Sequence, residues 1–299
     1  MSRYFTYIIK PEESGITIKD YLKKKSFSHA LIANLKKYED GIMVNGVRKY
    51  TDHHLVSDDE LNVCIREKPT VSRIMATELK LSVLYEDEDL MVVDKQAGIP
   101  IHPSRLNNTE TLANAVANYL TDKGIDPVFH CINRLDKDTS GLTIIAKNMY
   151  AASLLSEMIR IRTIRRDYLA ICEGIFRNNQ GSVCAPITRN GTSMIRYVDH
   201  ENGEYAETDY QVKGEGNGLS LVRLTLKTGK THQIRVHMKH IGHPLIGDRL
   251  YNPDNRIMER QALHAQKLTF THPVTGMNIS ITSDIPADME SVIRKYGII

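Results

Sequence analysis

The sequence contains no tryptophan and only four cysteines, at positions 64, 131, 172 and 184, and no two cysteines form a Cys-x-x-Cys pair. This spacing argues against a disulfide framework and against a thiolate metal site. No apolar run approaches the roughly eighteen residues of a membrane-spanning helix. The start of the chain also lacks the hydrophobic core and cleavage site of a secretory signal. We therefore expect a cytoplasmic protein.

Neither the length nor the average charge assigns a function. The 299 residues suit one large domain or two modest ones, and 41% hydrophobic with 25% charged residues is ordinary for a globular chain. A net charge of +3 permits a nucleic-acid partner but does not require one, because such partners are recognised by clustered charge. The distribution of the basic residues must therefore decide.

Residues 1–70 are predicted to form a separate small α/β domain. Apolar spacing indicates short helices around 18–22 and 28–35, followed by strands within 41–46 and 61–65. The helical region is rich in lysine, including Lys23, Lys24, Lys36 and Lys37, so one face should attract phosphates. Taken alone, these lysines would more simply be a solvated helix face.

A polar, proline-containing stretch follows, and we place a linker at 71–78 and a second domain at 79–299. That domain begins with a predicted hairpin over 79–93, then a helix opened by Thr109 or Thr111 and another over 149–161. Residues 203–218 are predicted to be turn-rich, and 219–226 a strand. With no internal repeat, the pattern predicts an α+β fold.

The segment Asn133-Arg-Leu-Asp136-Lys-Asp138-Thr-Ser-Gly141 places charges before an apolar strand, with a Ser-Gly turn expected between them. Two carboxylates two residues apart suit a surface turn, an acid-base pair or a metal site. Metal binding is disfavoured because Asp136 and Asp138 supply few oxygen ligands and Arg134 and Lys137 compete. The spacing alone favours a surface turn.

A second segment, from Thr228 to His243, contains Gly-Lys-Thr but is not a nucleotide-binding P-loop, because the first glycine of that motif is missing. We expect Thr231 to cap a helix that ends at Gly242 and projects Arg235 from its first turns. The spacing of His237, His240 and His243 could hold zinc. No cysteine accompanies them, so packing and phosphate contact are the simpler interpretation.

A third segment, Ile164-Arg-Arg-Asp-Tyr168-Leu-Ala-Ile, is predicted to be a strand. A tyrosine on a strand usually packs in the core. Because Arg165 and Arg166 precede Tyr168, a stacking surface for a base becomes a competing interpretation.

These segments, with Gln261-Ala-Leu-His264-Ala265 and Phe270-Thr-His-Pro273, resemble the RluA/RluD-type pseudouridine synthases from about Leu79 to Pro286. The N-terminal region more loosely resembles the ribosomal-protein-type (alpha-L) RNA-binding domain. The resemblance implies a mixed, largely antiparallel central sheet with flanking helices and loops, the pseudouridine synthase fold. It departs from the common family pattern at Gln96, Asn133 and Arg166-Asp167.

The resemblance also implies three catalytic residues. Asp136 would be the catalytic carboxylate, Tyr168 would stack on the target uracil, and Arg235 would pair with Asp136 and keep it ionised when buried. Conversion of uridine to pseudouridine gains and loses no atom, so we expect neither a metal nor another cofactor. The carboxylate either takes a ribose proton, giving a glycal, or bonds transiently to the substrate.

The expected partner is RNA, ribosomal rather than transfer RNA, with no membrane and no small-molecule cofactor, and we expect a monomer. The target uridine should be flipped out of the RNA, with Arg134 filling or clamping the vacated space. The remaining RNA-binding candidates are Lys137, Arg165, Arg166, Lys230, His232, Lys23, Lys24, Lys36 and Lys37. Two other functions compete: a non-catalytic ribosome-assembly factor on the same fold, and a metal-dependent RNA hydrolase, which lacks a ligand set.

Overall fold

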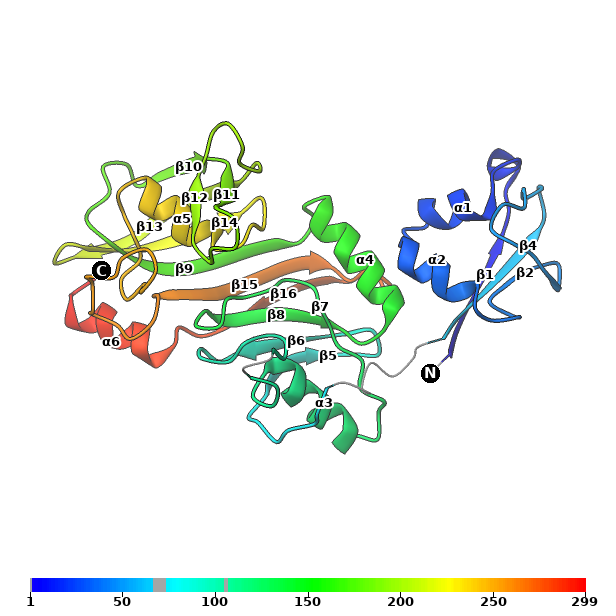
Figure 1. Cartoon of the computed structure of the whole chain (residues 1–299), viewed down its shortest axis with the longest axis horizontal. Coiled ribbons are helices and arrows are strands. Elements are labelled where there is room, and N and C mark those ends of the chain that lie inside the picture. The colour runs from blue at the N-terminus through cyan, green and yellow to red at the C-terminus, as the bar shows by residue number, and fades with distance from the viewer. Residues whose placement is uncertain (1, 67–73, 105–106) are drawn as a thin grey trace.

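A computed structural model describes residues 2–66, 74–104 and 107–299. Within these ranges the N-terminal residues form a four-stranded sheet with two helices, and the rest of the chain is built around a ten-stranded sheet. Figure 1 shows the two parts side by side along the long axis of the molecule. The α+β class predicted from the sequence is confirmed. No helix in these described ranges is long and apolar enough to cross a membrane.

The N-terminal unit, residues 2–66, has the sheet order β1-β4-β2-β3. Its elements are β1 (Ser2–Ile8), a 3-10 turn (Pro11–Glu13), α1 (Ile18–Lys24), α2 (His29–Leu35), β2 (Ile42–Val44), β3 (Val47–Arg48) and β4 (Glu60–Arg66). The two predicted helices and the two predicted strands are present. Sequence reasoning missed β1, although its half-buried Phe5 and Tyr7 alternate with exposed neighbours as strand residues do.

The ten-stranded sheet follows the order β10-β13-β14-β9-β15-β8-β6-β5, with β16 beside β15 and β7 beside β8. Its strands are β5 (Ser82–Glu86), β6 (Leu90–Lys95), β7 (His130–Cys131), β8 (Ser140–Ala146), β9 (Arg165–Glu173), β10 (Gln180–Cys184), β13 (Glu207–Gly216), β14 (Leu219–Leu226), β15 (Leu263–Thr271) and β16 (Asn278–Thr282). All of its neighbouring strands pair antiparallel except β15 and β8. The largely antiparallel sheet expected from the family resemblance is therefore present.

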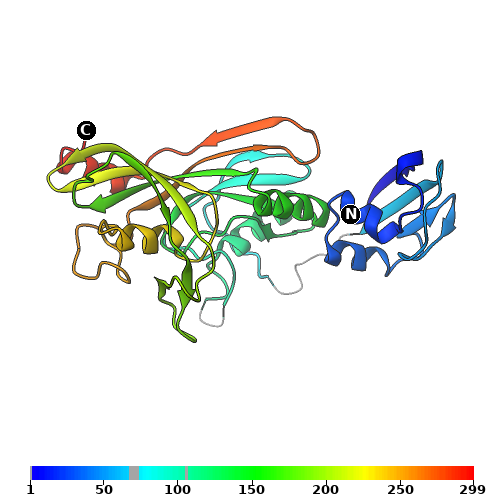
Figure 2. The ribbon, with the colours of Figure 1, turned by 90° about the horizontal axis from the view of Figure 1, so that it is seen from above.

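Four helices flank this sheet, and a separate two-stranded hairpin projects from it (Figure 2). The helices are α3 (Leu112–Asp122), α4 (Met149–Arg160), α5 (Gln233–His240) and α6 (Ala287–Lys295), and the hairpin is β11 (Ile187–Arg189) with β12 (Arg196–Val198). Thr111 caps α3 and Gly124 follows its end, in agreement with the predicted start and stop signals.

Two local predictions were wrong. Residues 203–218 are not mainly turns, because β13 occupies most of them. Its Gly214 and Gly216 are required by close packing rather than by turns: an added Cβ would meet the backbone of the C-terminal residues at 2.8 Å and 2.3 Å. Likewise Ser140 and Gly141 begin β8 and do not form the expected turn.

The sheet buries both of its faces, and β9 shows how. Tyr168 and Ala170 pack with Ile234 of α5, whereas Leu169 belongs to a different core cluster with Met289 of α6. Because side chains alternate along a strand, α5 lies on the face that carries Tyr168. This places the Thr228–His243 segment over β9, the strand that contains Arg165, Arg166 and Tyr168.

The N-terminal unit docks on α4 rather than hanging free. The ring of Tyr150 lies 4.4 Å from that of Phe5 and 5.4 Å from that of Phe27, measured between centroids. Beside them the backbone N–H of Ser28 donates to Ser153 Oγ at 2.7 Å. The predicted linker 71–78 begins at residues 71–73, which lie outside the described residues, so we treat the domain boundary as a proposal.

Candidate active site

Asp136 lies in a tight turn between β7 and β8, where the N–H of Thr139 donates to its carbonyl at 3.1 Å. The buried Asn133 anchors the start of this segment by donating to Leu142 O at 3.0 Å and accepting from Ile144 N–H at 2.8 Å. The Asp136 carboxylate remains 27% exposed. Its backbone is therefore fixed while its side chain can reach a ligand.

Lys95 braces the same turn from the end of β6. Its ammonium donates to the carbonyls of Gln96, Ile99 and Lys137 at 2.8 to 2.9 Å. Burial lowers the pKa of Lys95 to about 7, partly opposed by the nearby carboxylates of Asp138 and Asp136. Sequence reasoning assigned Lys95 no role, although a lysine ending an apolar strand was the available signal.

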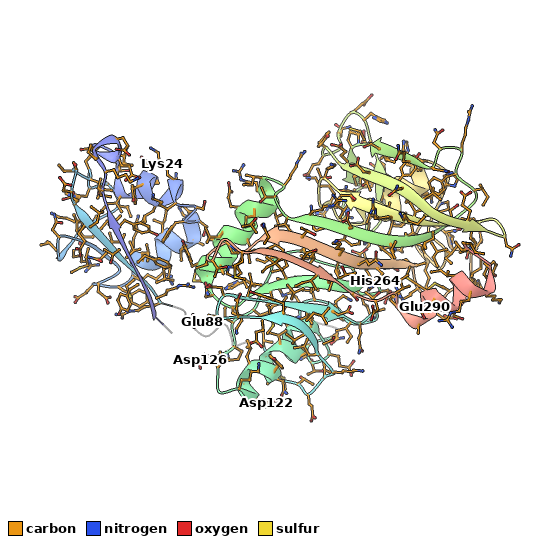
Figure 3. All side chains as sticks on the ribbon, turned by 180° about the vertical axis from the view of Figure 1, so that it is seen from behind. Lys24, Glu88, Asp122, Asp126, His264 and Glu290 are labelled. Carbon is orange, nitrogen blue, oxygen red and sulfur yellow. The ribbon has the colours of Figure 1, made fainter. Side chains whose placement is uncertain are left out.

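The Gln261-Ala-Leu-His264-Ala265 motif supports the turn from β15. The side chain of Gln261 donates to Thr139 Oγ1 at 3.2 Å, and His264 Nδ1 lies 3.0 Å from Ser140 Oγ. Figure 3 labels His264 on this strand. Burial lowers the pKa of His264, so at neutral pH it holds the start of β8 as an uncharged ring.

Arg235 projects from the first turn of α5, as predicted, but the predicted cap was wrong by one residue. The N-cap is His232, not Thr231, and His232 makes no side-chain capping bond. It has φ of 59° and ψ of 16°, a left-handed conformation that costs a non-glycine residue about 1–2 kcal/mol. Strain of this kind is typical of functional sites.

The guanidinium of Arg235 joins two carboxylates. Nε and Nη2 each donate to Asp248 at 2.7 Å, and Nη1 donates to Asp136 Oδ2 at 2.9 Å. Burial lowers the pKa of Arg235, but the bonds to Asp248 and Asp136 more than offset this and raise it. Arg235 is thus a fixed cation that aligns Asp136.

Sequence analysis assigned Asp248 no role, and the structure shows what it does. Its side chain is fully buried, and Oδ1 also accepts the backbone N–H groups of Leu250 and Tyr251 at 3.0 and 3.1 Å. The preceding Gly247 has φ of 66°, and a Cβ there would lie 2.2 Å from Arg260 O. Only glycine fits that backbone position, and the turn aims Asp248 at Arg235.

Tyr168 lines the pocket beside Asp136 and Arg235, together with the apolar side chains of Leu226 and Leu263. Burial raises the pKa of Tyr168, which keeps its hydroxyl protonated. The pocket therefore combines an aromatic surface, a carboxylate and a fixed cation from three distant segments.

The RNA-binding candidates near this pocket are only partly brought together. Arg134, Lys230 and His232 line it, and Lys230 pairs with Glu204 at its edge. Lys137 is exposed in the Asp136 turn. Of these residues, Arg134 and Lys137 are exposed and place positive charge near the pocket.

The two arginines before Tyr168 diverge from it. Arg165 lies on the opposite face of β9, where its Nε pairs with Asp167 at 3.0 Å, so the structure does not bring it to the pocket. Arg166 shares the face of Tyr168 but is buried, and its Nη2 donates to Thr228 O at 3.4 Å. Arg166 therefore supports the start of the Thr228–His243 segment and is not accessible to a base.

The histidines considered for zinc have other partners. His237 is buried and hydrogen bonds at 2.9 Å through both nitrogens, to Thr208 Oγ1 and Ala185 O. His243 stacks on Phe176 with ring centroids 3.8 Å apart. In the part of the chain that the structure describes, no group of three potential metal-ligating side chains is found.

The N-terminal lysines Lys23, Lys24, Lys36 and Lys37 are all exposed, and none pairs with a carboxylate among the described residues. Figure 3 shows Lys24 on the N-terminal unit, well apart from the ten-stranded sheet. These lysines therefore belong to a second surface and not to the pocket around Asp136.

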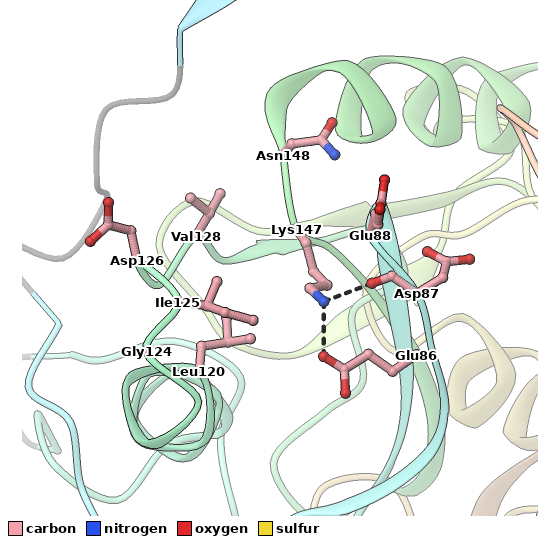
Figure 4. Close-up of a pocket in the computed structure, with 10 residues that line it drawn as sticks. All are labelled: Glu86, Asp87, Glu88, Leu120, Gly124, Ile125, Asp126, Val128, Lys147 and Asn148. Carbon is pink, nitrogen blue, oxygen red and sulfur yellow. Dashed lines mark hydrogen bonds and ion pairs between the residues drawn. The ribbon is translucent and has the colours of Figure 1, made fainter. Parts of the chain in front are cut away.

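A larger cavity lies elsewhere, between the β5–β6 turn and the end of α3 (Figure 4). Lys147 Nζ donates there to Glu86 Oε1 at 2.8 Å and to Asp87 O at 2.6 Å. The other charged lining residues are Glu88 and Asp126, so the rim is acidic. An acidic rim repels phosphates, and none of the sequence-predicted site residues lines this cavity.

The chain is similar to known RNA pseudouridine synthases in sequence and in fold. A sequence profile of the family described as RNA pseudouridylate synthase matches residues 89–240. The chain is 34% identical to the uncharacterized RNA pseudouridine synthase YjbO of Bacillus subtilis, over 93% of this chain and 99% of that protein. It is 35% identical to the ribosomal large subunit pseudouridine synthase D of Yersinia pestis, over 85% and 82%. The fold resembles human RNA pseudouridylate synthase domain containing 1 with a TM-score of 0.59 and 24% identity, over 73% and 95% of the two chains.

Proposed function

This chain belongs to the RluA/RluD-type RNA pseudouridylate synthases, isomerases that convert uridine to pseudouridine in RNA, and on this premise we propose that it modifies ribosomal RNA with Asp136 as its catalytic carboxylate. The relatives named as ribosomal large subunit enzymes support the substrate. Transfer RNA is the competing substrate. As a modifier of ribosomal RNA the protein would act in the cytoplasm.

The observation that carries the assignment of Asp136 is its ion pair with Arg235, 2.9 Å long, inside a pocket that also contains Tyr168. The fixed guanidinium of Arg235 orients this accessible carboxylate, and either chemical route requires a carboxylate held in place beside the substrate. In one route Asp136 removes a ribose proton and a glycal forms; in the other it bonds transiently to the substrate. Both routes place the carboxylate at the ribose.

Tyr168 is proposed to stack on the uracil. Stacking has little preference for rotation about the ring normal, so the detached base can be held while it turns to present C5 to the ribose. Because the reacting atoms are concealed in stacked RNA, the uridine must first be flipped out. Arg134, exposed at the edge of the pocket, is proposed to fill the space it leaves.

The N-terminal unit is proposed to be an RNA-binding domain of the ribosomal-protein type, covering residues 1–70. Its exposed lysines would bind phosphates outside the catalytic pocket and make the affinity sensitive to salt. The protein is proposed to act as a monomer. The reaction needs no cofactor because substrate and product have the same atoms.

The test incubates unmodified ribosomal and transfer RNA, without added metal, with the wild type, Asp136→Asn or Asp138→Asn. Pseudouridines are mapped by carbodiimide-dependent reverse-transcription stops. Asp138→Asn is the matched control, because it removes a carboxylate two residues away that does not contact Arg235. We expect new stops in ribosomal RNA with the wild type and Asp138→Asn, and none with Asp136→Asn.

Stops confined to transfer RNA would overturn the proposed substrate while leaving the reaction intact. Stops that persist with Asp136→Asn would overturn the catalytic assignment. RNA binding without stops on naked RNA or on ribosomal precursor particles would favour a non-catalytic assembly factor.

A further inference from the structure

His232 combines features that neither its packing nor helix capping explains. Its side chain is only 11% exposed, it lines the pocket, and its backbone is held in a left-handed conformation. Asparagine or glycine would adopt that conformation more easily. The fold therefore maintains a strained histidine at the edge of the reaction site.

Tyr251 is the hydrogen-bond partner of His232 Nδ1. The Tyr251 hydroxyl oxygen accepts the backbone N–H of Arg196 at 2.8 Å and lies 2.9 Å from His232 Nδ1. With that N–H accepted, the phenolic hydrogen is available to donate to Nδ1. Burial lowers the pKa of His232, partly opposed by Asp136, so the ring is neutral at neutral pH. When the Tyr251 hydroxyl donates to Nδ1, the ring proton of His232 resides on Nε2.

The Nε2–H group points to where the substrate must bind. Nε2 is 3.8 Å from Asp136 Oδ2, too far for a hydrogen bond, and it has no other hydrogen-bond partner within the described residues. Both routes of the proposed reaction bring Asp136 to the ribose. A donor less than 4 Å from that carboxylate lies beside the ribose rather than beside the uracil, which Tyr168 holds.

We propose that His232 Nε2–H donates to the 2′-hydroxyl oxygen of the flipped uridine, and that Tyr251 is a positioning residue that fixes this tautomer. The pair would then distinguish RNA from DNA at the target nucleotide, because the 2′-hydroxyl is the group that differs. This inference rests on the proposed catalytic role of Asp136. It adds a basis for selecting ribose over deoxyribose at the same site.

The support for Tyr251 is itself structural. Its backbone N–H donates to Asp248, the residue that also holds Arg235, and its ring lies 5.0 Å from the Arg235 guanidinium. Arg196, which donates to its hydroxyl, begins strand β12 of the projecting hairpin. One buried carboxylate therefore orders both the cation that aligns Asp136 and the tyrosine that aligns His232.

The experiment compares two versions of the RNA fragment that carries the mapped uridine, one with uridine and one with 2′-deoxyuridine at that position. Single-turnover rates are measured for the wild type, His232→Asn, Tyr251→Phe and Lys230→Met. Dissociation constants are measured for the same series in an Asp136→Asn background, where no product forms. Asparagine tolerates the left-handed backbone, so His232→Asn removes the ring without adding strain.

We expect His232→Asn to lose about tenfold in affinity or rate on the uridine fragment, the value of one hydrogen bond, and less than about twofold on the deoxyuridine fragment. Tyr251→Phe should show the same selectivity with a smaller loss. Lys230→Met, which removes a charge at the pocket edge, should weaken both fragments equally.

Equal losses on both fragments for His232→Asn would overturn the proposal, because they would indicate a phosphate or purely structural role. Failure of the wild type to convert the uridine fragment would instead count against the proposed function. The dissociation constants still test the contact with the sugar in that case.

Discussion

Asp248 holds Arg235 by two parallel hydrogen bonds of 2.7 Å, and this buried pair presents the remaining guanidinium nitrogen to Asp136. Two carboxylates thus share one cation. Because Asp248 occupies Nε and Nη2, Asp136 meets only Nη1 and is not locked in a closed bidentate pair. Asp136 keeps one oxygen free of Arg235 for its reaction with the ribose.

Asp248→Asn should lower the single-turnover rate by about 10- to 100-fold, the range for residues that orient a directly acting group. It should also lower the free energy of unfolding by about 1.5–3 kcal/mol, as expected for hydrogen bonds to charged groups. The matched control is Asp40→Asn, which breaks an Arg–Asp pair with Arg66 in the N-terminal unit. Both variants are compared by single-turnover rate assays and by urea denaturation. Equal activity of Asp248→Asn and Asp40→Asn would refute the proposed role of Asp248.

Tyr168→Phe and Tyr168→Ala should separate the ring from its hydroxyl. Phenylalanine preserves the stacking surface, so RNA affinity should stay within about threefold, whereas alanine should lose about 1–3 kcal/mol of base stacking. If the hydroxyl relays the C5 proton, Tyr168→Phe will also release tritium from [5-³H]uridine more slowly. The measurements are filter binding and tritium release. Equal affinities for the two variants would contradict the stacking role.

Replacement of Lys23, Lys24, Lys36 and Lys37 by alanine should flatten the salt dependence of RNA binding. Each lost phosphate contact should reduce the slope of log K against log salt by about 1, while the rate at saturating RNA stays unchanged. The control replaces four exposed lysines of the ten-stranded part, Lys80, Lys213, Lys267 and Lys295. A slope unchanged in the first variant, or reduced equally in both, would count against an RNA-binding surface on the N-terminal unit.

Glu86→Gln should make unfolding less sensitive to acid. Burial raises the pKa of Glu86, but hydrogen bonds from Lys123, Lys147 and Tyr119 outweigh it and lower the pKa to about 2. A carboxyl with a depressed folded pKa stabilises the fold above its unfolded value of about 4.5, and this stability is lost as the pH falls toward 2.

The difference corresponds to about 3 kcal/mol at about 1.4 kcal/mol per pKa unit. Urea denaturation between pH 5 and pH 2 should therefore show a shallower decline for Glu86→Gln than for the wild type. Glu88→Gln, at an exposed neighbouring position, should follow the wild-type curve. Parallel curves for Glu86→Gln and the wild type would show that the Lys147 and Lys123 contacts do not control acid stability.

Tyr150→Ala should release the N-terminal unit from α4. The variant loses two ring contacts, each worth about 0.5–1.5 kcal/mol. The ion pair of Arg3 with Asp89 and the hydrogen bonds of Ser153 with Ser28 and Ser26 remain. Spin labels at residues 47 and 197 should give a narrow distance distribution in the wild type and a broad one in the variant. Tyr197 is exposed, so a spin label at this position should not disturb the packing of the core. Identical narrow distributions would show that other contacts suffice for docking.

Local patterns in the sequence determined most of the secondary structure and the family. The spacing around Ser28 and Thr111 identified helix starts that the structure confirms, because a cap and its helix interact over three or four residues. The motif around Asp136 and the one around Arg235 likewise pointed to the correct family. Such information is local, so a single sequence contains it.

The tertiary structure alone decided how residues far apart in the chain meet. Asp136 and Arg235 are 99 positions apart, and their contact depends on the placement of α5 over β9. The roles of Asp248 and Tyr251 had no local signal, since a buried side chain of this kind is identified by its partners and not by its neighbours in sequence. The opposite orientations of Arg165 and Tyr168 followed from the strand's alternation once the sheet was formed, because the two faces of a strand meet different environments.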